Sequence, residues 1–386
     1  MMRAITKGSQ MAVVSEAYGR ALEEDITAPV SHPMFDQSAV DGYGIRYGDL
    51  SGKKSFKVVG EIKAGDRGRM KIGEHEAVSI FTGSPVPDTV DAIVMKEDVK
   101  VAGQSIIISK NNIHQGANIR RKGEQISKGD VAMEGGALLT AASLGFLASL
   151  GIPVARVYKL PAVGMIITGN EIISSKEDLQ EGKIFESNGI MLSNSLKLLG
   201  LKADAAWCRD NLNALKKGIR SAETKYDTII TTGGVSVGKY DFVRNALEQL
   251  GYTIHIHGVA QKPGKPFLFA QKEKVSVFGL PGNPLSAMVC YYEYVYPFLR
   301  ACMGCRNPFM REVKLPLSAA YAKKHDGKTH FLAGKIKDGS ALILEKQHSH
   351  MLQSMAKADV IIQMPDNRTR FRKGDAVCAQ LLPEAR

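Results

Sequence analysis

The sequence predicts a multi-domain protein that combines a central, mostly parallel α/β domain with β-rich domains. Three observations support this fold class. The chain has 386 residues, which corresponds to roughly two to four domains of ordinary size. It contains 38 glycines, grouped in short motifs of the kind that special backbone turns require. Short β-branched runs in its first part give way further along to alternating strands and helices.

The first part of the chain is predicted to be mainly β. Residues 11–24 resemble a short helix, and residues 35–135 carry Gly, Pro and Asp turn signals between short strands. Residues 135–155 carry no charge and are long enough to span a bilayer. Because Gly151 interrupts this stretch, residues 138–150 are predicted to form a short buried helix. No membrane association is expected.

Apolar strands and helices alternate in the second part of the chain. Strands are predicted at 162–167, 228–231, 253–259, 266–270 and 275–279. Helices are predicted at 187–199, 241–250 and 284–299. This alternation is typical of a doubly wound, mostly parallel sheet with helices on both faces. Residues from 308 onward return to short strands and turns, which predicts a small β-barrel or sandwich domain.

The charge and the cysteine content indicate the class of ligand and the cellular compartment. The chain has 51 basic and 39 acidic residues, which gives a net charge of +12. The basic residues are dispersed and are not interleaved with aromatic residues, so a small anionic ligand is favoured over nucleic acid. Five cysteines do not make a disulfide framework in a chain of this length, and no apolar leader is visible at Met1-Met2-Arg3. A cytoplasmic protein is therefore expected.

The strongest local motif follows the strand predicted at 228–231. It runs Thr231-Thr-Gly-Gly-Val-Ser-Val-Gly238 and leads into a helix, so its backbone N–H groups can approach a phosphate closely. The residues expected to form this anion cradle are Gly233, Gly234, Ser236 and Gly238. A tight turn that packs strand on helix is the alternative. Asp241, which follows, is either a cation ligand or an ordinary helix N-cap.

Two further loops have features that suit anions. Lys262-Pro-Gly-Lys265-Pro266 displays two ammonium groups on a loop stiffened by prolines, although a solvated turn gives the same pattern. In Pro281-Gly-Asn-Pro284, the Asn suits a helix N-cap and Pro284 suits the first helical position, with Ser286 in the first turn. Because these loops and residues 168–171 follow predicted strands at their carboxyl ends, one shared anion site is predicted.

Seven motifs occur in one order along the chain. They are Phe35 to Gly44, Phe81 to Pro87, Arg121 to Glu124, Thr168 to Glu171, Thr231 to Gly238, Lys262 to Pro266 and Leu280 to Pro284. Together they resemble the MoeA family of molybdopterin molybdenumtransferases, to which the E domain of gephyrin is related. The resemblance extends over nearly the whole chain.

The resemblance implies a fold in four parts and a homodimer. The implied parts are an elongated linker or dimerisation region (1–31 and 136–160), a β-rich domain (32–135), an α/β molybdopterin-binding domain (161–306) and a C-terminal β-barrel-like domain (307–386). In the implied homodimer, each cleft combines the α/β domain of one chain with the β-rich domain of the other. A transient contact with the molybdopterin adenylyltransferase is also implied.

The implied reaction is hydrolysis of adenylylated molybdopterin, coupled to insertion of molybdate into the dithiolene, with release of AMP and a requirement for Mg²⁺. The implied catalytic residues are Asp41, Thr82, Glu171, Asp210 and Asp241. Asp41 and Thr82 are expected to act on the cleft of the other chain, and Glu171 and Asp241 are expected to bind the metal. The residues implied to bind substrate or oxyanion, besides the glycine loop, are Lys262, Lys265, Pro281, Pro284, Ser286 and Ser349.

Three positions depart from the family pattern. Asn170 stands where the family has Asp, and Lys328 and Ala333 stand where two arginines are expected. Binding of the oxyanion by the C-terminal domain is therefore expected to be weaker or to involve other residues. Two alternatives remain, a molybdopterin adenylyltransferase of the sister family, which has a similar glycine loop, and a non-catalytic scaffold like gephyrin. The Lys-Pro-Gly-Lys motif and the β-rich domain argue against the first, and the lack of a long linker argues against the second.

Overall fold

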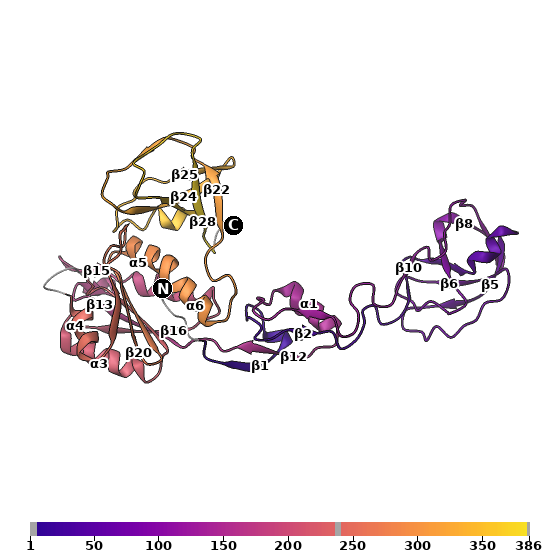
Figure 1. Ribbon diagram of the computed structural model, residues 1–386, viewed down its shortest axis with the longest axis horizontal. Helices are drawn as coiled ribbons and strands as arrows, with labels where there is room; N and C mark the ends of the chain where they lie inside the picture. Colours follow the sequence, from indigo (N-terminus) through magenta and orange to yellow (C-terminus); the bar gives the residue numbers. More distant parts are fainter. Residues whose placement is uncertain (1–5, 236–240, 384–386) are drawn as a thin grey trace.

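The computed structural model describes residues 6–235 and 241–383. The molecule is elongated, and its regions follow one another along the long axis (Figure 1). A β-rich region lies at one end, a narrow region that contains α1 (Ala141–Ser149) lies in the middle, and the α/β and C-terminal regions lie together at the other end. The predicted fold class, α/β combined with β-rich regions, is confirmed.

The β-rich region contains a six-stranded sheet of order β7-β4-β6-β5-β9-β8. Its strands are β4 (Gly42–Ile45), β5 (Ser55–Ile62), β6 (Glu76–Ile80), β7 (Ala92–Met95), β8 (Val99–Ala102) and β9 (Ser105–Ile108). Ile45, Phe56 and Ile106 are fully buried in one apolar cluster of this region. A separate two-stranded ladder joins β3 (Gln37–Ser38) to β10 (Ile119–Arg120).

The narrow middle region joins two parts of the chain that are far apart in sequence. β1 (Ser9–Val13) pairs antiparallel with β12 (Val154–Tyr158), and β2 (Ile26–Thr27) pairs antiparallel with β11 (Val131–Met133). The helix predicted at 11–24 is therefore wrong, because its first residues are extended against β12 and only a short 3₁₀ turn follows.

The helix predicted at 138–150 is present as α1, but the prediction that it is buried is wrong, because Leu147 is the one buried residue along it. Thr140 caps its N-terminus in a capping box with Ser143, and Gly151 follows its end with φ = 74°. In the part of the chain that the structure describes, no helix is both long and apolar enough to cross a membrane.

The α/β region contains a six-stranded sheet of order β16-β13-β17-β21-β20-β18. In that order its strands are β16 (Ala203–Cys208), β13 (Val163–Thr168), β17 (Thr228–Thr232), β21 (Val275–Leu280), β20 (Leu268–Lys272) and β18 (Thr253–His257). The first four are parallel to one another, and β20 is antiparallel to both of its neighbours. The predicted mostly parallel sheet is thus present.

Helices cover both faces of this sheet. One face packs against α2 (Asn188–Lys197), α5 (Pro284–Cys290) and α6 (Tyr296–Cys302), with a π-helical turn at Tyr291–Val295 between α5 and α6. The other face packs against α3 (Leu212–Glu223) and α4 (Phe242–Gln249). All residues of β13 and β17 are buried, as expected for central strands covered on both faces.

The C-terminal region is a second β structure. Its strands are β22 (Glu312–Pro316), β24 (Thr329–Lys337), β25 (Ser340–Ile343), β26 (Val360–Met364) and β28 (Ala376–Leu381), with a separate ladder of β23 (Tyr321–Ala322) and β27 (Arg370–Phe371). The short strand β19 (Gln261–Lys262) precedes β20 in sequence but pairs with β24. The segment at Lys262 therefore connects the α/β sheet to the C-terminal sheet.

Candidate functional site

The carboxyl ends of three central strands meet at one edge of the α/β sheet. β13 ends at Thr168, β17 ends at Thr232 and β21 ends at Leu280. β20 runs in the opposite direction, and its first residue, Leu268, pairs with Gly279 near the end of β21. The loop that precedes β20 therefore reaches the same edge, so the four loops expected to share one site do lie at one edge of the sheet.

A cleft of about 530 Å³ opens at this edge. Its walls include the two short strands β14 (Ile172–Ile173) and β15 (Ile184–Phe185), the start of α2 and one residue of the C-terminal region. The lining residues are Thr168, Gly169, Glu171, Ile172, Ile184, Phe185, Glu186, Ser187, Asn188, Asp210, Gly233, Gly234, Gly282, Asn283, Pro284 and His350. Five predicted site residues are thus brought together, namely Glu171, Asp210, Gly233, Gly234 and Pro284.

Asp210 and Glu171 form the acidic wall of the cleft. The backbone N–H of Asp210 donates to Oδ1 of Asn170 at 3.3 Å. Oδ1 of Asp210 is buried and has no hydrogen-bond partner among the described residues. Burial raises the pKa of Asp210 above its usual value, and the negative charge of Glu171 raises it further. A cation or a hydrogen-bond donor from a ligand would therefore stabilise the ionised form of Asp210.

The turn after β17 depends on two glycines. Gly233 and Gly234 have φ angles of 81° and 63°, in the left-handed region. A Cβ at Gly233 would lie 2.7 Å from the carbonyl oxygen of Thr168, and a Cβ at Gly234 would lie 3.2 Å from Oδ1 of Asp210. The two glycines therefore let this turn pack closely against Thr168 and Asp210. The predicted cradle residues Ser236 and Gly238 lie outside the described residues.

Asp241 is the N-cap of α4 and is not among the residues that line the cleft. Its Oδ1 accepts a hydrogen bond from the backbone N–H of Arg244 at 3.1 Å, and its Oδ2 lies 2.7 Å from Nε2 of His257. Both oxygens of this buried carboxylate therefore have protein partners. The structure pairs Glu171 with Asp210 in the cleft, and a metal-binding role for Asp241 stays a prediction.

Lys262 and Lys265 are exposed on the loop before β20 and do not line the cleft. Gly264 lies between them with φ = 93°, and a Cβ there would lie 2.6 Å from Sγ of Cys290. The glycine therefore lets this loop pack directly on α5. The loop is fixed at its base while both ammonium groups remain at the surface.

The loop from Pro281 to Pro284 is held by the C-terminal region. Nδ2 of Asn283 donates to Oγ of Ser349 at 3.1 Å, and His350 lines the cleft beside this contact. Ser286 is buried within α5 and is not a lining residue. Ser349 thus shapes the cleft through Asn283.

Asp41 and Thr82 form a hydrogen-bonded pair in the β-rich region. Oδ1 of Asp41 accepts from the backbone N–H of Thr82 at 2.9 Å and from its Oγ1 at 2.8 Å. These bonds, the backbone one most, lower the pKa of Asp41. The strand β6, which leads to Thr82, lies at the opposite end of the molecule from β13 (Figure 1). The pair is therefore remote from the cleft of its own chain.

The cleft is suited to one particular mode of metal binding. No group of three or more His, Cys, Asp or Glu side chains within residues 6–235 and 241–383 is arranged to hold a metal ion. Mg²⁺ does not need such a group, since it is usually bound by one or two carboxylates together with substrate phosphates and water. Glu171 and the unpartnered oxygen of Asp210 supply such a pair, so the residues present fit Mg²⁺ bound together with a phosphate-bearing substrate.

Three residues that line the cleft were not among the site residues predicted from the sequence. Glu186, Asn188 and His350 all line the cleft. Nδ2 of Asn188 donates to the carbonyl oxygen of Gly282 at 2.8 Å, which ties the start of α2 to the loop after β21. The sequence indicated Asn188 only as part of a helix start, because its contact partner is 94 residues away.

The α/β region and its cleft place the protein in the class of molybdopterin-binding proteins, since residues 164–301 match a family model described as a probable molybdopterin binding domain. Residues 2–151 match the model of the MoeA N-terminal region (domain I and II), and residues 314–382 match that of the MoeA C-terminal region (domain IV). The chain belongs to the MoeA family.

Named relatives and solved structures agree with this assignment. The chain is 34% identical to molybdopterin molybdenumtransferase of Haemophilus influenzae over 370 residues, covering 94% of this chain and 91% of the relative. It is 30% identical to the protein of the same name from Staphylococcus aureus over 391 residues, covering 98% and 93%. Two crystal structures of the molybdopterin biosynthesis MoeA protein of Pyrococcus horikoshii each match 98% of this chain. The first has 29% sequence identity and a TM-score of 0.80, and 95% of its chain is covered. The second has 28% sequence identity and a TM-score of 0.83, and 96% of its chain is covered. The family predicted from the sequence is confirmed.

Proposed function

We propose that the protein is a molybdopterin molybdenumtransferase that acts on adenylylated molybdopterin in the cleft at the strand ends. One observation carries the proposal. The carboxylate of Asp210, whose buried Oδ1 has no partner among the described residues, lines the same cleft as Glu171 and the turn at Gly233 and Gly234. Backbone N–H groups suit a phosphate, and paired carboxylates suit the cation that accompanies it.

The cleft residues have distinct roles in the proposed reaction. When bound, Mg²⁺ would supply positive charge beside the phosphoanhydride, held by Glu171 and Asp210. The glycine turn would orient the phosphate. Oδ1 of Asn170 would help to hold Asp210 in place by accepting a hydrogen bond from the backbone N–H of Asp210. Hydrolysis of the phosphoanhydride releases AMP, and molybdenum enters the dithiolene. The protein supplies mainly positioning and electrostatics, as is usual for chemistry at phosphorus.

The pair Asp41 and Thr82 is proposed to complete the cleft of a second copy of the chain in a homodimer. Within one chain, the β-rich region and the cleft lie at opposite ends of an elongated molecule (Figure 1). A hydrogen-bonded carboxylate that stays ionised and exposed is suited to act on a ligand brought by another chain. The enzyme is proposed to work in the cytoplasm and to receive its substrate from a molybdopterin adenylyltransferase.

The proposed function is tested by reconstitution. The protein is incubated with adenylylated molybdopterin, molybdate and Mg²⁺, and AMP is quantified by chromatography while a molybdenum-free apoenzyme reports cofactor formation. We expect AMP release that depends on both molybdate and Mg²⁺, and activation of the apoenzyme. Absence of AMP release under all these conditions would contradict the proposal.

A further inference from the structure

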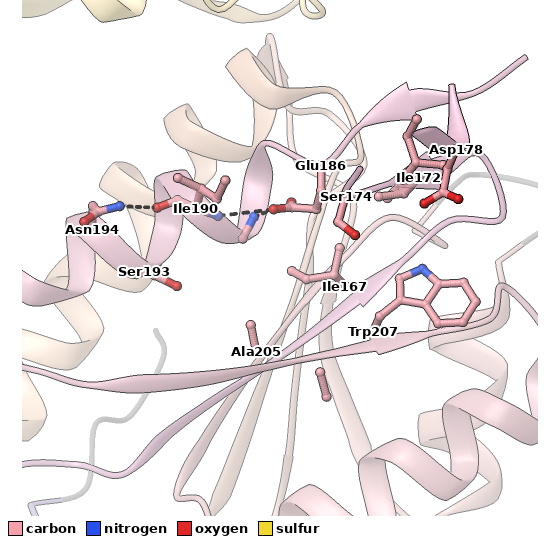
Figure 2. Close-up of a pocket in the computed structure, with 13 residues that line it drawn as sticks. Ile167, Ile172, Ser174, Asp178, Glu186, Ile190, Ser193, Asn194, Ala205 and Trp207 are labelled. Carbon is pink, nitrogen blue, oxygen red and sulfur yellow. Dashed lines mark hydrogen bonds between the residues drawn. The ribbon is translucent and has the colours of Figure 1, made fainter. Parts of the chain in front are cut away.

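A second hollow, of about 700 Å³, adjoins the cleft (Figure 2). It lies between α2, the ladder of β14 and β15, and the edge strand β16. Ile172 and Glu186 line both this hollow and the cleft. A ligand whose phosphate lies at the glycine turn can therefore extend into the second hollow without crossing the protein.

One wall of the hollow is an aromatic ring held in a fixed orientation. Trp207 lies on β16 with 55% of its surface exposed, and its Nε1 donates to the carbonyl oxygen of Gly169 at 3.2 Å. Gly169 itself lines the cleft. A large ring that is both exposed and oriented by the site loop provides a platform on which a flat heterocycle can stack.

The charged groups around the hollow are carboxylates, and its other polar lining residues are Ser174, Ser193 and Asn194. Among the residues that the structure describes, the lining contains two carboxylates, Asp178 and Glu186, and no Lys or Arg. Glu186 already accepts hydrogen bonds from the backbone N–H groups of Gly189 and Ile190. The carboxylate of Asp178 lines the same hollow as Trp207 (Figure 2) and has no hydrogen-bond or ion-pair partner among the described residues. It is therefore free to accept hydrogen bonds from a ligand.

We infer that this hollow binds the pterin end of the substrate, with the pterin stacked on Trp207 and its aminopyrimidinone edge donating to Asp178. The inference rests on the proposed function, whose substrate carries two flat heterocycles, pterin and adenine. The pterin edge offers adjacent N–H donors at N3 and the 2-amino group, which match a carboxylate. The corresponding edge of adenine has one donor, the 6-amino group, beside an acceptor at N1. The lone pair of N1 would repel the carboxylate.

The first test uses Trp207 as its own reporter, because it is the single tryptophan of the chain. Free pterin and AMP are titrated separately into the full-length protein while tryptophan emission is followed, with free tryptophan as the control for absorption by the ligands. We expect saturable quenching by pterin and unchanged emission with AMP. Quenching by AMP but not by pterin would show that the hollow binds adenine. No response to either ligand would show that neither heterocycle binds beside Trp207. Both outcomes overturn the inference.

The second test measures binding of pterin by the anisotropy of its own fluorescence. Replacing Trp207 by Ala should weaken binding by about 5- to 150-fold, since stacking on an aromatic side chain is worth roughly 1–3 kcal/mol per base. Trp207→Phe should retain most of the affinity, and Asp178→Asn should weaken binding about 10-fold. The matched control is Asp204→Asn on the same strand, whose carboxylate accepts from the hydroxyl of Tyr226 and does not line the hollow. Equal affinity in Trp207→Ala and the wild type would refute the assignment.

The two proposals fail separately. If the wild-type protein releases AMP from adenylylated molybdopterin but pterin binding does not depend on Trp207, only the pterin assignment is wrong. If pterin binds at Trp207 but no AMP is released, the proposed function is wrong and the hollow is a pterin site of another activity.

Discussion

Replacing Asp210 by Asn should stabilise the protein and impair its proposed reaction at the same time. In the wild type, one carboxylate oxygen is buried without a partner among the described residues, and burial and the negative charge of Glu171 oppose ionisation. The neutral amide removes the charge and keeps the shape of the side chain. A side chain that lowers the stability of the folded state is expected at a functional site rather than elsewhere in the protein.

The size of both effects follows from the structure. A buried polar group without a partner costs about 1–3 kcal/mol, so relief of part of this cost should raise the thermal transition by about 2–4 °C per kcal/mol for a domain of this size. Loss of one charged oxygen that binds Mg²⁺ costs a similar amount of binding free energy, so the Mg²⁺ concentration that gives half-maximal AMP release should rise roughly 5- to 150-fold.

The stability effect should depend on pH in a defined direction. The pKa of Asp210 is higher in the folded state than in the unfolded state, so the folded state keeps the proton to higher pH. As pH rises between the unfolded and the folded pKa, the unfolded state loses this proton first, and the free energy of unfolding of the wild type decreases. The gain of Asp210→Asn should therefore be present at pH 7 and shrink as pH falls toward the unfolded pKa. Calorimetry and AMP release are the assays, with Asp204→Asn as the control. An unchanged Mg²⁺ requirement in Asp210→Asn would refute the role assigned to this carboxylate.

Three further predictions concern the dimer, the oxyanion and the loop before β20. Asp41→Ala and Glu171→Ala should each abolish AMP release, whereas mixed dimers should regain it, since one of their two clefts is intact; inactive mixed dimers would exclude a shared cleft. Lys265→Ala should raise the molybdate requirement roughly 10- to 150-fold if its ammonium binds the oxyanion, and an unmoved titration midpoint would place molybdate elsewhere. Gly264→Ala should cost about 1–3 kcal/mol more in unfolding free energy than Gly258→Ala, because both have positive φ but only Gly264 meets Cys290 closely; equal costs would contradict this packing argument.

Sequence patterns predicted the parts of the site that depend on local chemistry. Glycines followed the strand at β17, and a Pro-Gly-Asn-Pro turn followed β21, so both could be assigned to one edge of a parallel sheet. The edge strand β16 was not predicted, because its sequence Ala203-Asp-Ala-Ala-Trp-Cys208 has no β-branched residue. It is extended because it pairs with β13 along its whole length. Trp207, and with it the second hollow, could therefore be found only in three dimensions.

Asp241 shows why a local motif cannot separate a structural role from a catalytic one. An Asp between a glycine-rich loop and a helix has the right position for an N-cap and for a cation ligand. The group that distinguishes them is His257, which approaches from β18, 16 residues further along. A variant without an acceptor at position 241 would lose the cap, a loss of about 0.5–2 kcal/mol, and would reduce activity through the helix alone. Asp241→Asn keeps an oxygen for the N–H of Arg244 and removes only the charge. A reduced AMP release in that variant with unchanged stability would therefore support a role for the charge itself.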